Sequence, residues 1–231
     1  TRSSLLSLMV TATLIHMTVA TTIILQSRVG STRYRGKMLA DICGMTLLER
    51  VLRRLEFAMN GVPQVLALPY TPENDPLETI ALHRGWRIHR GSEPDVLKRY
   101  ADTIRKFRIE RFIRATGDNP FTDIDCVRHV IASLDHDIVC SATGYPEGSS
   151  VEGAHSSALL ESDAEATDPY DREHVMPYLY KHSELFPSRI IPCPWKNADL
   201  FSVTVDTAED MERARRIFMS LGENPQTPDI L

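Results

Sequence analysis

Four basic side chains, two glycines and several hydroxyl groups lie close together in residues 27–37, directly after an apolar stretch. The cations are Arg28, Arg33, Arg35 and Lys37. Glycine-rich turns let backbone N–H groups approach an anion closely, and guanidinium and ammonium groups supply the charge that a polyphosphate needs. The spacing is not that of a Walker A loop, since no Ser or Thr follows Lys37. We therefore predict a triphosphate-binding loop of another type, with an ordinary basic surface turn as the alternative.

Two aspartates are placed to hold a metal ion. Asp118 comes directly after the stretch FIRATG, and Asp206 follows FSVTV and precedes a helical segment. The carboxyl ends of parallel strands meet at one edge of a sheet, where ligands bind. Mg²⁺ favours one or two carboxylates together with waters and phosphate oxygens, so the pair predicts a magnesium site. A helix-starting role is the alternative for Asp206, whereas Asp123 is better placed than Asp118 to cap the next helix.

The first two thirds of the chain alternate between strand-like and helix-like segments. Strands are expected at residues 21–26, 64–69, 86–90, 111–116 and 137–142, and helices at 46–58, 75–85, 93–107 (with an acidic first turn) and 123–134. This alternation predicts a mostly parallel sheet that is covered by helices on both faces.

After Ala142 the alternation stops. Residues 144–153 are rich in turn-forming residues; helices are expected at 156–166, 168–182 and 208–221, and strands at 188–195 and 200–205. We predict a single domain over residues 17–221, in which an insert at about 143–200 binds the substrate and forms a dimer contact, followed by a tail at 222–231.

The amino-terminal residues 4–25 are apolar enough to imitate a signal peptide or a membrane span. We expect neither, because residues 21–26 must form a buried strand if the basic loop is to be positioned. Met17 is a natural starting point for the domain, and residues 1–16 are then an upstream extension.

Composition narrows the range of partners. The net charge of −5 argues against a nucleic-acid-binding protein but leaves room for a local basic pocket. The four cysteines show no C-x-x-C spacing and are typical of free thiols in a reducing compartment. We expect a cytoplasmic protein that binds anionic small molecules, and neither a nucleic acid nor a membrane.

Five segments, in order along the chain, resemble motifs of the cytidylyltransferase family that includes spore coat polysaccharide biosynthesis proteins. They are QSRVGSTRYRGKML, GSEPDVLKRY, RATGDNPFTD, TDPYDREHV and TVDTAED. The chain is more distantly similar to 3-deoxy-manno-octulosonate and acylneuraminate cytidylyltransferases, and the resemblance covers about residues 21–220. It implies an α/β, Rossmann-like nucleotide-diphospho-sugar transferase fold and a Mg²⁺-dependent enzyme, expected to be a homodimer, that activates a sugar with CTP and releases pyrophosphate.

The resemblance also assigns roles by position. Arg28, Lys37 and Asp118 match catalytic residues of the family, and Asp118 and Asp206 match its Mg²⁺-binding aspartates. The implied nucleotide-binding residues are Gln26, Ser27, Arg28, Gly30, Ser31, Thr32, Arg33, Lys37, Ser92, Asp95, Val96, Arg114, Thr116 and Gly117. The implied sugar-binding residues are Glu152, Arg172, Glu173 and His174, with packing as the alternative role for His174.

The chain departs from the family pattern in two places. Members usually read L-P-G-K where this chain has residues 34–37 (YRGK), so an arginine replaces a proline that stiffens the loop. They commonly read D-G-L-D-V-E where residues 147–152 read EGSSVE, so Ser150 replaces an acid while Glu152 keeps its place. The second difference concerns the sugar contacts and not the nucleotide contacts.

The expected reaction is in-line attack by a sugar oxygen on the α-phosphorus of a nucleoside triphosphate, with cations stabilising the charge that grows on the leaving group. One alternative is a glycosyltransferase of similar fold that uses a finished nucleotide sugar, and another is a non-catalytic protein. The basic loop favours a triphosphate as the ligand. GTP or another triphosphate is the alternative to CTP.

Overall fold

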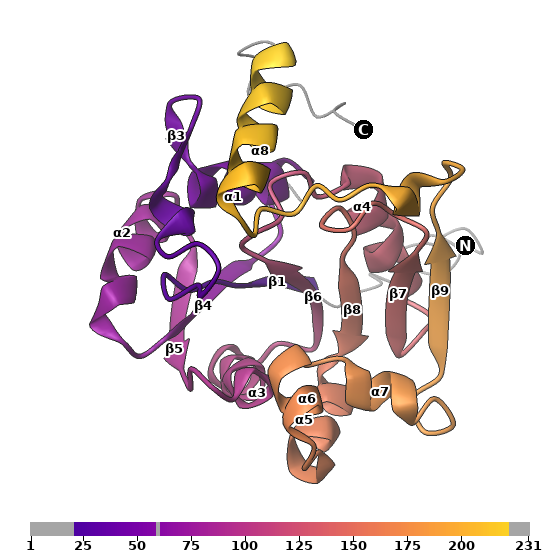
Figure 1. Ribbon diagram of the computed structural model, residues 1–231. Coiled ribbons are helices and arrows are strands. Elements are labelled where there is room, and N and C mark those ends of the chain that lie inside the picture. The colour runs from indigo at the N-terminus through magenta and orange to yellow at the C-terminus, as the bar shows by residue number, and fades with distance from the viewer. Residues whose placement is uncertain (1–20, 59–60, 222–231) are drawn as a thin grey trace, which may run out of the picture.

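The computed structural model describes residues 21–58 and 61–221, and its elements are labelled in Figure 1. The strands are β1 (Thr21–Gln26), β2 (Asp41–Ile42), β3 (Met45–Thr46), β4 (Gln64–Pro69), β5 (Arg87–Gly91), β6 (Arg111–Thr116), β7 (Val139–Thr143), β8 (Glu152–His155) and β9 (Ser188–Pro192). The α-helices are α1 (Leu47–Ala58), α2 (Asp75–His83), α3 (Val96–Phe107), α4 (Ile124–Ser133), α5 (Ser156–Glu165), α6 (Pro169–His174), α7 (Pro177–Lys181) and α8 (Ala208–Ser220). Short 3₁₀ helices are η1 (Lys37–Leu39), η2 (Pro72–Asn74) and η3 (Ala198–Leu200). The predicted extension at 1–16, the start at Met17 and the tail at 222–231 lie outside the described residues.

A seven-stranded sheet forms the centre of the fold, in the order β5-β4-β1-β6-β8-β7-β9. The strands β5, β4, β1 and β6 are parallel, β7 is parallel to β9, and β8 is antiparallel to both of its neighbours. The predicted mostly parallel α/β sheet is therefore confirmed. Because β1 and β6 are adjacent and parallel, they deliver the loops that follow them to the same edge of the sheet (Figure 1).

Alternate residues of the buried strands face opposite helical layers. Ile23 and Leu25 of β1 pack with side chains of α1, α2, α4 and α8, whereas Ile24 packs with side chains of α3, α5 and α7. All three β1 side chains are fully buried, as expected for a strand that is covered on both faces. In Figure 1, α3, α5, α6 and α7 form one group and α1, α4 and α8 form another.

Two strand predictions are wrong. β8 lies within and just beyond the stretch predicted to be turns, and its Gly153 and Ala154 carry no β-branched signal. Residues 200–205 were predicted as a strand, but they form only a single bridge, between Glu147 and Ser202. Their backbone groups bond to loops instead, since the Val203 N–H donates to Glu147 and the Val205 N–H donates to Asp118. Asp206 thus follows an extended segment and not a strand.

The observed helices agree with the predicted ones in position but differ in where some of them begin and end. The acidic first turn expected for the helix at 93–107 is wrong, because α3 begins at Val96 and Asp95 is its N-cap, accepting from the Lys98 N–H at 2.9 Å. Asp123 caps α4 as predicted. The helix expected at 168–182 is split into α6 and α7 at Val175, whose φ is 74°. Within residues 21–58 and 61–221, no helix combines the length and the apolar character needed to cross a bilayer.

Candidate active site

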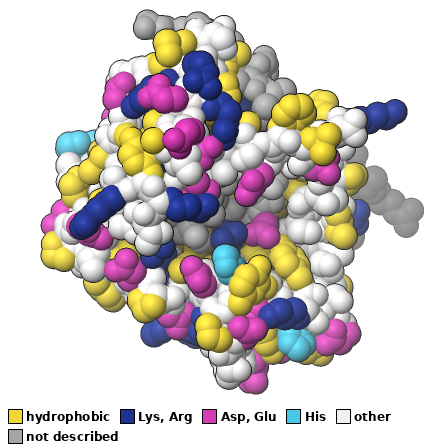
Figure 2. All heavy atoms as spheres, in the orientation of Figure 1, with side chains coloured by type: hydrophobic (Ala, Val, Ile, Leu, Met, Phe, Trp, Pro, Cys, Tyr) yellow, Lys and Arg dark blue, Asp and Glu magenta, His cyan; other side chains and the backbone are white. Residues whose placement is uncertain are grey.

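A cavity of about 440 Å³ opens where β1 and β6 end. It is lined by Gln26, Ser27, Arg28, Ser31, Thr32, Arg33, Lys37, Met38, Glu93, Pro94, Val96, Arg99, Arg114, Thr116, Gly117, Asp118, Glu173, His174 and Asp206. The space-filling view shows basic, acidic and histidine side chains close together around the middle of this face (Figure 2). Segments that are far apart in the sequence therefore converge on one polar cavity.

The basic loop is fixed by hydrogen bonds at its base. The Val29 carbonyl accepts from the Ser31 N–H at 2.8 Å and from the Gly36 N–H at 3.1 Å, which folds the loop back on itself. The Val29 N–H donates to Oδ1 of the fully buried Asn74 at 2.9 Å. Gly36 has a φ of 76°, a conformation that glycine adopts without strain. The loop backbone is ordered in this way while the Arg28 and Arg33 side chains stay 45% and 66% exposed.

Lys37 holds the two predicted metal-binding aspartates together. Its side chain is buried, and Nζ lies 2.9 Å from Asp206 Oδ1, 3.4 Å from Asp118 Oδ2 and 2.7 Å from the Val205 carbonyl oxygen. An ammonium group has three donors, so all three are used within the protein. Arg33 also reaches Asp206 Oδ1, at 2.9 Å. Lys37, Arg33 and the two carboxylates thus lie on the same rim of the sheet, whereas Arg35 lies outside the cavity lining and pairs with Glu73 at 3.4 Å.

The Asp118 and Asp206 carboxylates fit the role of Mg²⁺ ligands. They converge on one cationic group, and their side chains stay 32% and 17% exposed. In the described part of the chain, no group of three or more His, Cys, Asp or Glu side chains gathers to hold a metal. A divalent ion held by this pair would therefore take its other ligands from water and from substrate phosphates, which is a common arrangement for Mg²⁺.

Four buried polar atoms of cavity-lining residues have no hydrogen-bond partner among the described residues. They are the acceptors Gln26 Oε1 and Ser27 Oγ and the donors Arg99 Nε and Arg114 Nε. Buried polar groups are usually paired, so such atoms suit a ligand that completes their bonding. Gly117 packs closely behind Ser27: a Cβ there would lie 2.7 Å from Ser27 Oγ and 3.0 Å from Met38 Cε. A larger residue at this position would therefore force the Ser27 and Met38 side chains to shift.

Four lining residues were missed by the sequence reasoning. Glu93 and Pro94 lie inside the motif GSEPDVLKRY, so the motif itself was the signal that could have found them. Met38 gave no signal beyond its place after Lys37. Arg99 is 3% exposed, and burial lowers the pKa of its guanidinium, which donates from Nη1 to the Ser92 carbonyl. A charged group so deep in the wall could not be predicted, because its depth depends on how α3 packs.

A second cavity of about 480 Å³ adjoins the first and shares Arg114 and His174 with it. Glu152 lines it and accepts from Arg114 Nη1 at 2.6 Å and from the Tyr180 hydroxyl at 2.7 Å. Burial opposes the charged form of Arg114, but the Glu152 charge outweighs it and raises the pKa of Arg114. Burial and the same charge raise the pKa of Tyr180. The result is a preorganised polar cluster beside the first cavity.

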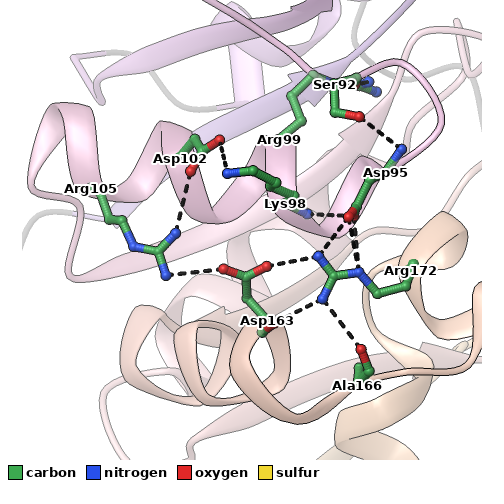
Figure 3. Close-up of polar contacts among 9 residues, drawn as sticks. All are labelled: Ser92, Asp95, Lys98, Arg99, Asp102, Arg105, Asp163, Ala166 and Arg172. Atoms are coloured by element: carbon green, nitrogen blue, oxygen red, sulfur yellow. Dashed lines mark hydrogen bonds and ion pairs between the residues drawn. The ribbon is translucent and has the colours of Figure 1, made fainter.

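Five predicted site residues do not line the first cavity. Gly30 lies in the basic loop but outside the lining, and Ser92 Oγ accepts from the Asp95 N–H at 3.1 Å. Asp95 and Arg172 bind each other, with Arg172 Nη2 2.7 Å from Asp95 Oδ2 (Figure 3). Glu152 lines only the second cavity, whereas Glu173 lines the first and His174 lines both.

Known proteins resemble this chain over most of its length. The model of a family described as cytidylyltransferase matches residues 22–227. Spore coat polysaccharide biosynthesis protein SpsF of Bacillus subtilis is 30% identical over 213 residues, which are 87% of this chain and 88% of that protein. A 3-deoxy-manno-octulosonate cytidylyltransferase of Nitrobacter hamburgensis is 31% identical over 154 residues, covering 64% of this chain and 54% of that protein. The structure of a cytidylyltransferase from Leptospira borgpetersenii superposes with a TM-score of 0.78 at 27% identity, over 89% of this chain and 88% of that one.

Proposed function

The chain belongs to the cytidylyltransferase family, and from that premise we propose that it transfers CMP from CTP to a sugar oxygen in a Mg²⁺-dependent reaction. The observation that carries the proposal is the buried contact of Lys37 with both Asp118 and Asp206 in a cavity that Arg28 and Arg33 also line. Such an arrangement supplies both the anionic ligands for a metal ion and the cations for a triphosphate.

The residues act by positioning and by electrostatic stabilisation. The acceptor oxygen bonds to the α-phosphorus as the bond from that phosphorus to the bridging oxygen breaks, so that pyrophosphate leaves with the electron pair. Arg28 and Arg33 are exposed enough to move onto the β- and γ-phosphates and offset the growing charge. A bound Mg²⁺, held by Asp118 and Asp206, would add positive charge and orient the phosphate oxygens. No covalent intermediate with the protein is needed.

Lys37 was expected to bind the triphosphate, but in the structure it binds the two carboxylates. Its three donors are used by Asp118, Asp206 and Val205, so it fixes the spacing of the two carboxylates. Gln26 and Ser27 offer unpaired oxygens, and Thr116 and Gly117 lie at the end of β6 beside them. We assign this part of the wall to the nucleoside.

We assign the acceptor sugar to the second cavity. Glu152, held by Arg114 and Tyr180, presents a carboxylate that can accept hydrogen bonds from sugar hydroxyls. His174 lines both cavities, so it lies where acceptor and nucleotide meet. Its ring contacts the Tyr170 ring, with 4.3 Å between ring centres and an angle of 42° between the planes. Glu173 faces the nucleotide side of the same junction.

The decisive experiment is the melting temperature of the protein with each of the four ribonucleoside triphosphates and MgCl₂. A ligand that binds only the folded state stabilises it, by about 2.7 kcal/mol at 100 times its Kd. We expect CTP to give the largest increase and to lose most of its effect when EDTA is added. Stabilisation by a nucleoside diphosphate sugar, with none by any triphosphate, would favour a glycosyltransferase instead.

A further inference from the structure

An ion pair joins two walls of the cavity from behind. One wall is the start of α3 and the segment before it, where Glu93, Pro94 and Val96 line the cavity, and the other is the end of α6, where Glu173 and His174 line it. Asp95 and Arg172 are the sequence neighbours of these residues, but their side chains turn toward each other and outside the lining (Figure 3). We propose that Asp95 and Arg172 are positioning residues that set the gap between these walls, and hence the fit of the nucleotide.

The contacts of Arg172 leave none of its three nitrogens without a partner. Nε lies 3.1 Å from each Asp95 carboxylate oxygen, and Nη2 lies 2.7 Å from Oδ2 of the same residue. Nη2 also donates to Asp163 Oδ1 at 2.9 Å, and Nη1 donates to the Asp163 carbonyl at 2.8 Å and the Ala166 carbonyl at 3.4 Å. Arg172 therefore links α6 to both α3 and α5, and its guanidinium nitrogens are all engaged within the protein.

The wall residues are also held from the other side. Val175, directly after His174, is fully buried and has φ 74° and ψ −54°, and the Met176 N–H donates to the His174 carbonyl at 2.9 Å. This is a tight three-residue turn that a β-branched residue seldom adopts. Strained backbone persists only where the surroundings fix it, and it is concentrated at functional sites. Glu173 and His174 are thus fixed by Arg172 before them and by Val175 after them.

The inference rests on the proposed function, because the ligand whose fit is set is taken to be CTP. A displacement of about 1 Å in a binding wall can cost on the order of 100-fold in rate, so a loss of about tenfold in affinity is a reasonable scale for a loosened wall. The losses from the two partners should not add, since each variant breaks the same link.

Calorimetric titration with CTP and MgCl₂ tests the inference on four variants. Asp95→Asn keeps an oxygen to cap α3 but removes the charge; Arg172→Met removes the other partner; the double variant removes both. Arg105→Ala is the matched control, because the exposed Arg105 binds the far side of Asp163, at 3.0 Å, within the same network. We expect about tenfold weaker CTP binding for both single variants and the same loss for the double variant, with the control within about twofold of wild type.

Three results would overturn the inference. Weaker binding in Arg172→Met with unchanged or tighter binding in Asp95→Asn would make Arg172 a direct phosphate ligand. Additive losses in the double variant, or a lower melting temperature with an unchanged Kd, would show that the pair does not position the wall. If the wild-type protein binds none of the four triphosphates, the proposed function itself is wrong. This outcome is distinguishable from failure of the inference, because it is measured on the wild-type protein alone.

Discussion

Lys37 is the residue on which the geometry of the carboxylate pair depends. Replacing it by Met would leave Asp118 and Asp206 facing one another without a shared cation, and Val205 without a donor. We expect Lys37→Met to destabilise the fold by about 2 kcal/mol and to weaken CTP binding. Urea unfolding and calorimetry would measure both.

Lys181→Met is the control for that variant. Lys181 also bridges two aspartates, Asp168 at 3.3 Å and Asp171 at 2.6 Å, but its side chain is 47% exposed. Water screens the ion pairs of this exposed ammonium group, so we expect a smaller loss of stability than in Lys37→Met, although Asp171 itself is buried. Equal losses in the two variants would contradict a special role for Lys37.

Asp118→Asn and Asp206→Asn test the metal site without changing side-chain size. We expect each to weaken Mn²⁺ binding in the presence of CTP by about tenfold or more, because a neutral amide is a poorer ligand for a hard cation. Electron paramagnetic resonance of free Mn²⁺ would give the affinity, and circular dichroism would verify the fold. Asp125→Asn, at an exposed position of α4, should bind Mn²⁺ like wild type. Unchanged affinity in both site variants would exclude the two-aspartate site.

The cysteines differ in predicted reactivity. Burial raises the pKa of Cys126 to about 11 and that of Cys140 to about 12, whereas Cys43 and Cys193 are partly exposed. The thiolate is the reactive form, and a raised pKa leaves almost none of it at pH 8. We expect Cys43 and Cys193 to be alkylated first by iodoacetamide in the native protein, as read by peptide mass spectrometry. Early labelling of Cys126 would contradict the packing of α4.

At the scale of elements, the start of α8 fixes the backbone of Asp206. Asp210 accepts from the Asp206 N–H at 3.0 Å and the Thr207 N–H at 2.9 Å, and Thr207 Oγ1 accepts from the Asp210 N–H in return. Burial works to raise the pKa of Asp210, but the hydrogen bonds from Thr207 and Asp206 outweigh it and lower that pKa. The capping box therefore links the last helix to the active site.

This cap predicts a dependence of stability on pH. A carboxyl whose pKa is lower in the folded state stabilises the fold above its unfolded pKa, and this contribution is lost as the pH falls through the folded pKa. We expect Asp210→Asn to cost about 1 kcal/mol at pH 7, and the difference from wild type to shrink below about pH 4. Thermal unfolding across that range would measure it. A difference independent of pH would contradict the capping role.

The elements that sequence could predict are those that carry their own signal. β1, β4, β6 and the capped helix α4 have buried apolar patterns and turn residues at their ends, and they fix where Asp118 must lie. β8 carries no such signal because α4 packs against it so closely that a Cβ on Gly153 would lie 2.9 Å from Leu134 and Val130 side-chain carbons. The strand prediction for residues 200–205 was wrong because valines favour strands, whereas the backbone of this segment forms its hydrogen bonds with loops. The Asp95–Arg172 contact could not be predicted, since it depends on how α3 and α6 meet.

At the scale of the whole molecule, the expected homodimer stays a prediction. Large apolar side chains are exposed on β9 and just beyond it: Ile190 is 62% exposed, Leu200 78% and Phe201 66%. All three lie at or near the carboxyl end of the insert predicted to form the dimer contact, and exposed apolar patches commonly mark interfaces. We expect light scattering after size exclusion to give a dimer mass at micromolar concentration. Phe201→Ser should shift it toward the monomer, whereas Phe57→Ser, on the exposed side of α1, should not.

The antiparallel direction of β8 has a consequence for substitutions near the second cavity. Because β8 runs opposite to β6, its first residue, Glu152, lies in register with Arg114 near the end of β6. The stretch before β8 therefore opens onto the same rim as the basic loop and Asp118. This stretch also bonds to the segment that leads to Asp206, because the Val203 N–H donates to the Glu147 carbonyl. Substitutions in residues 144–151 that reshape the second cavity should therefore also affect the position of the Asp206 carboxylate.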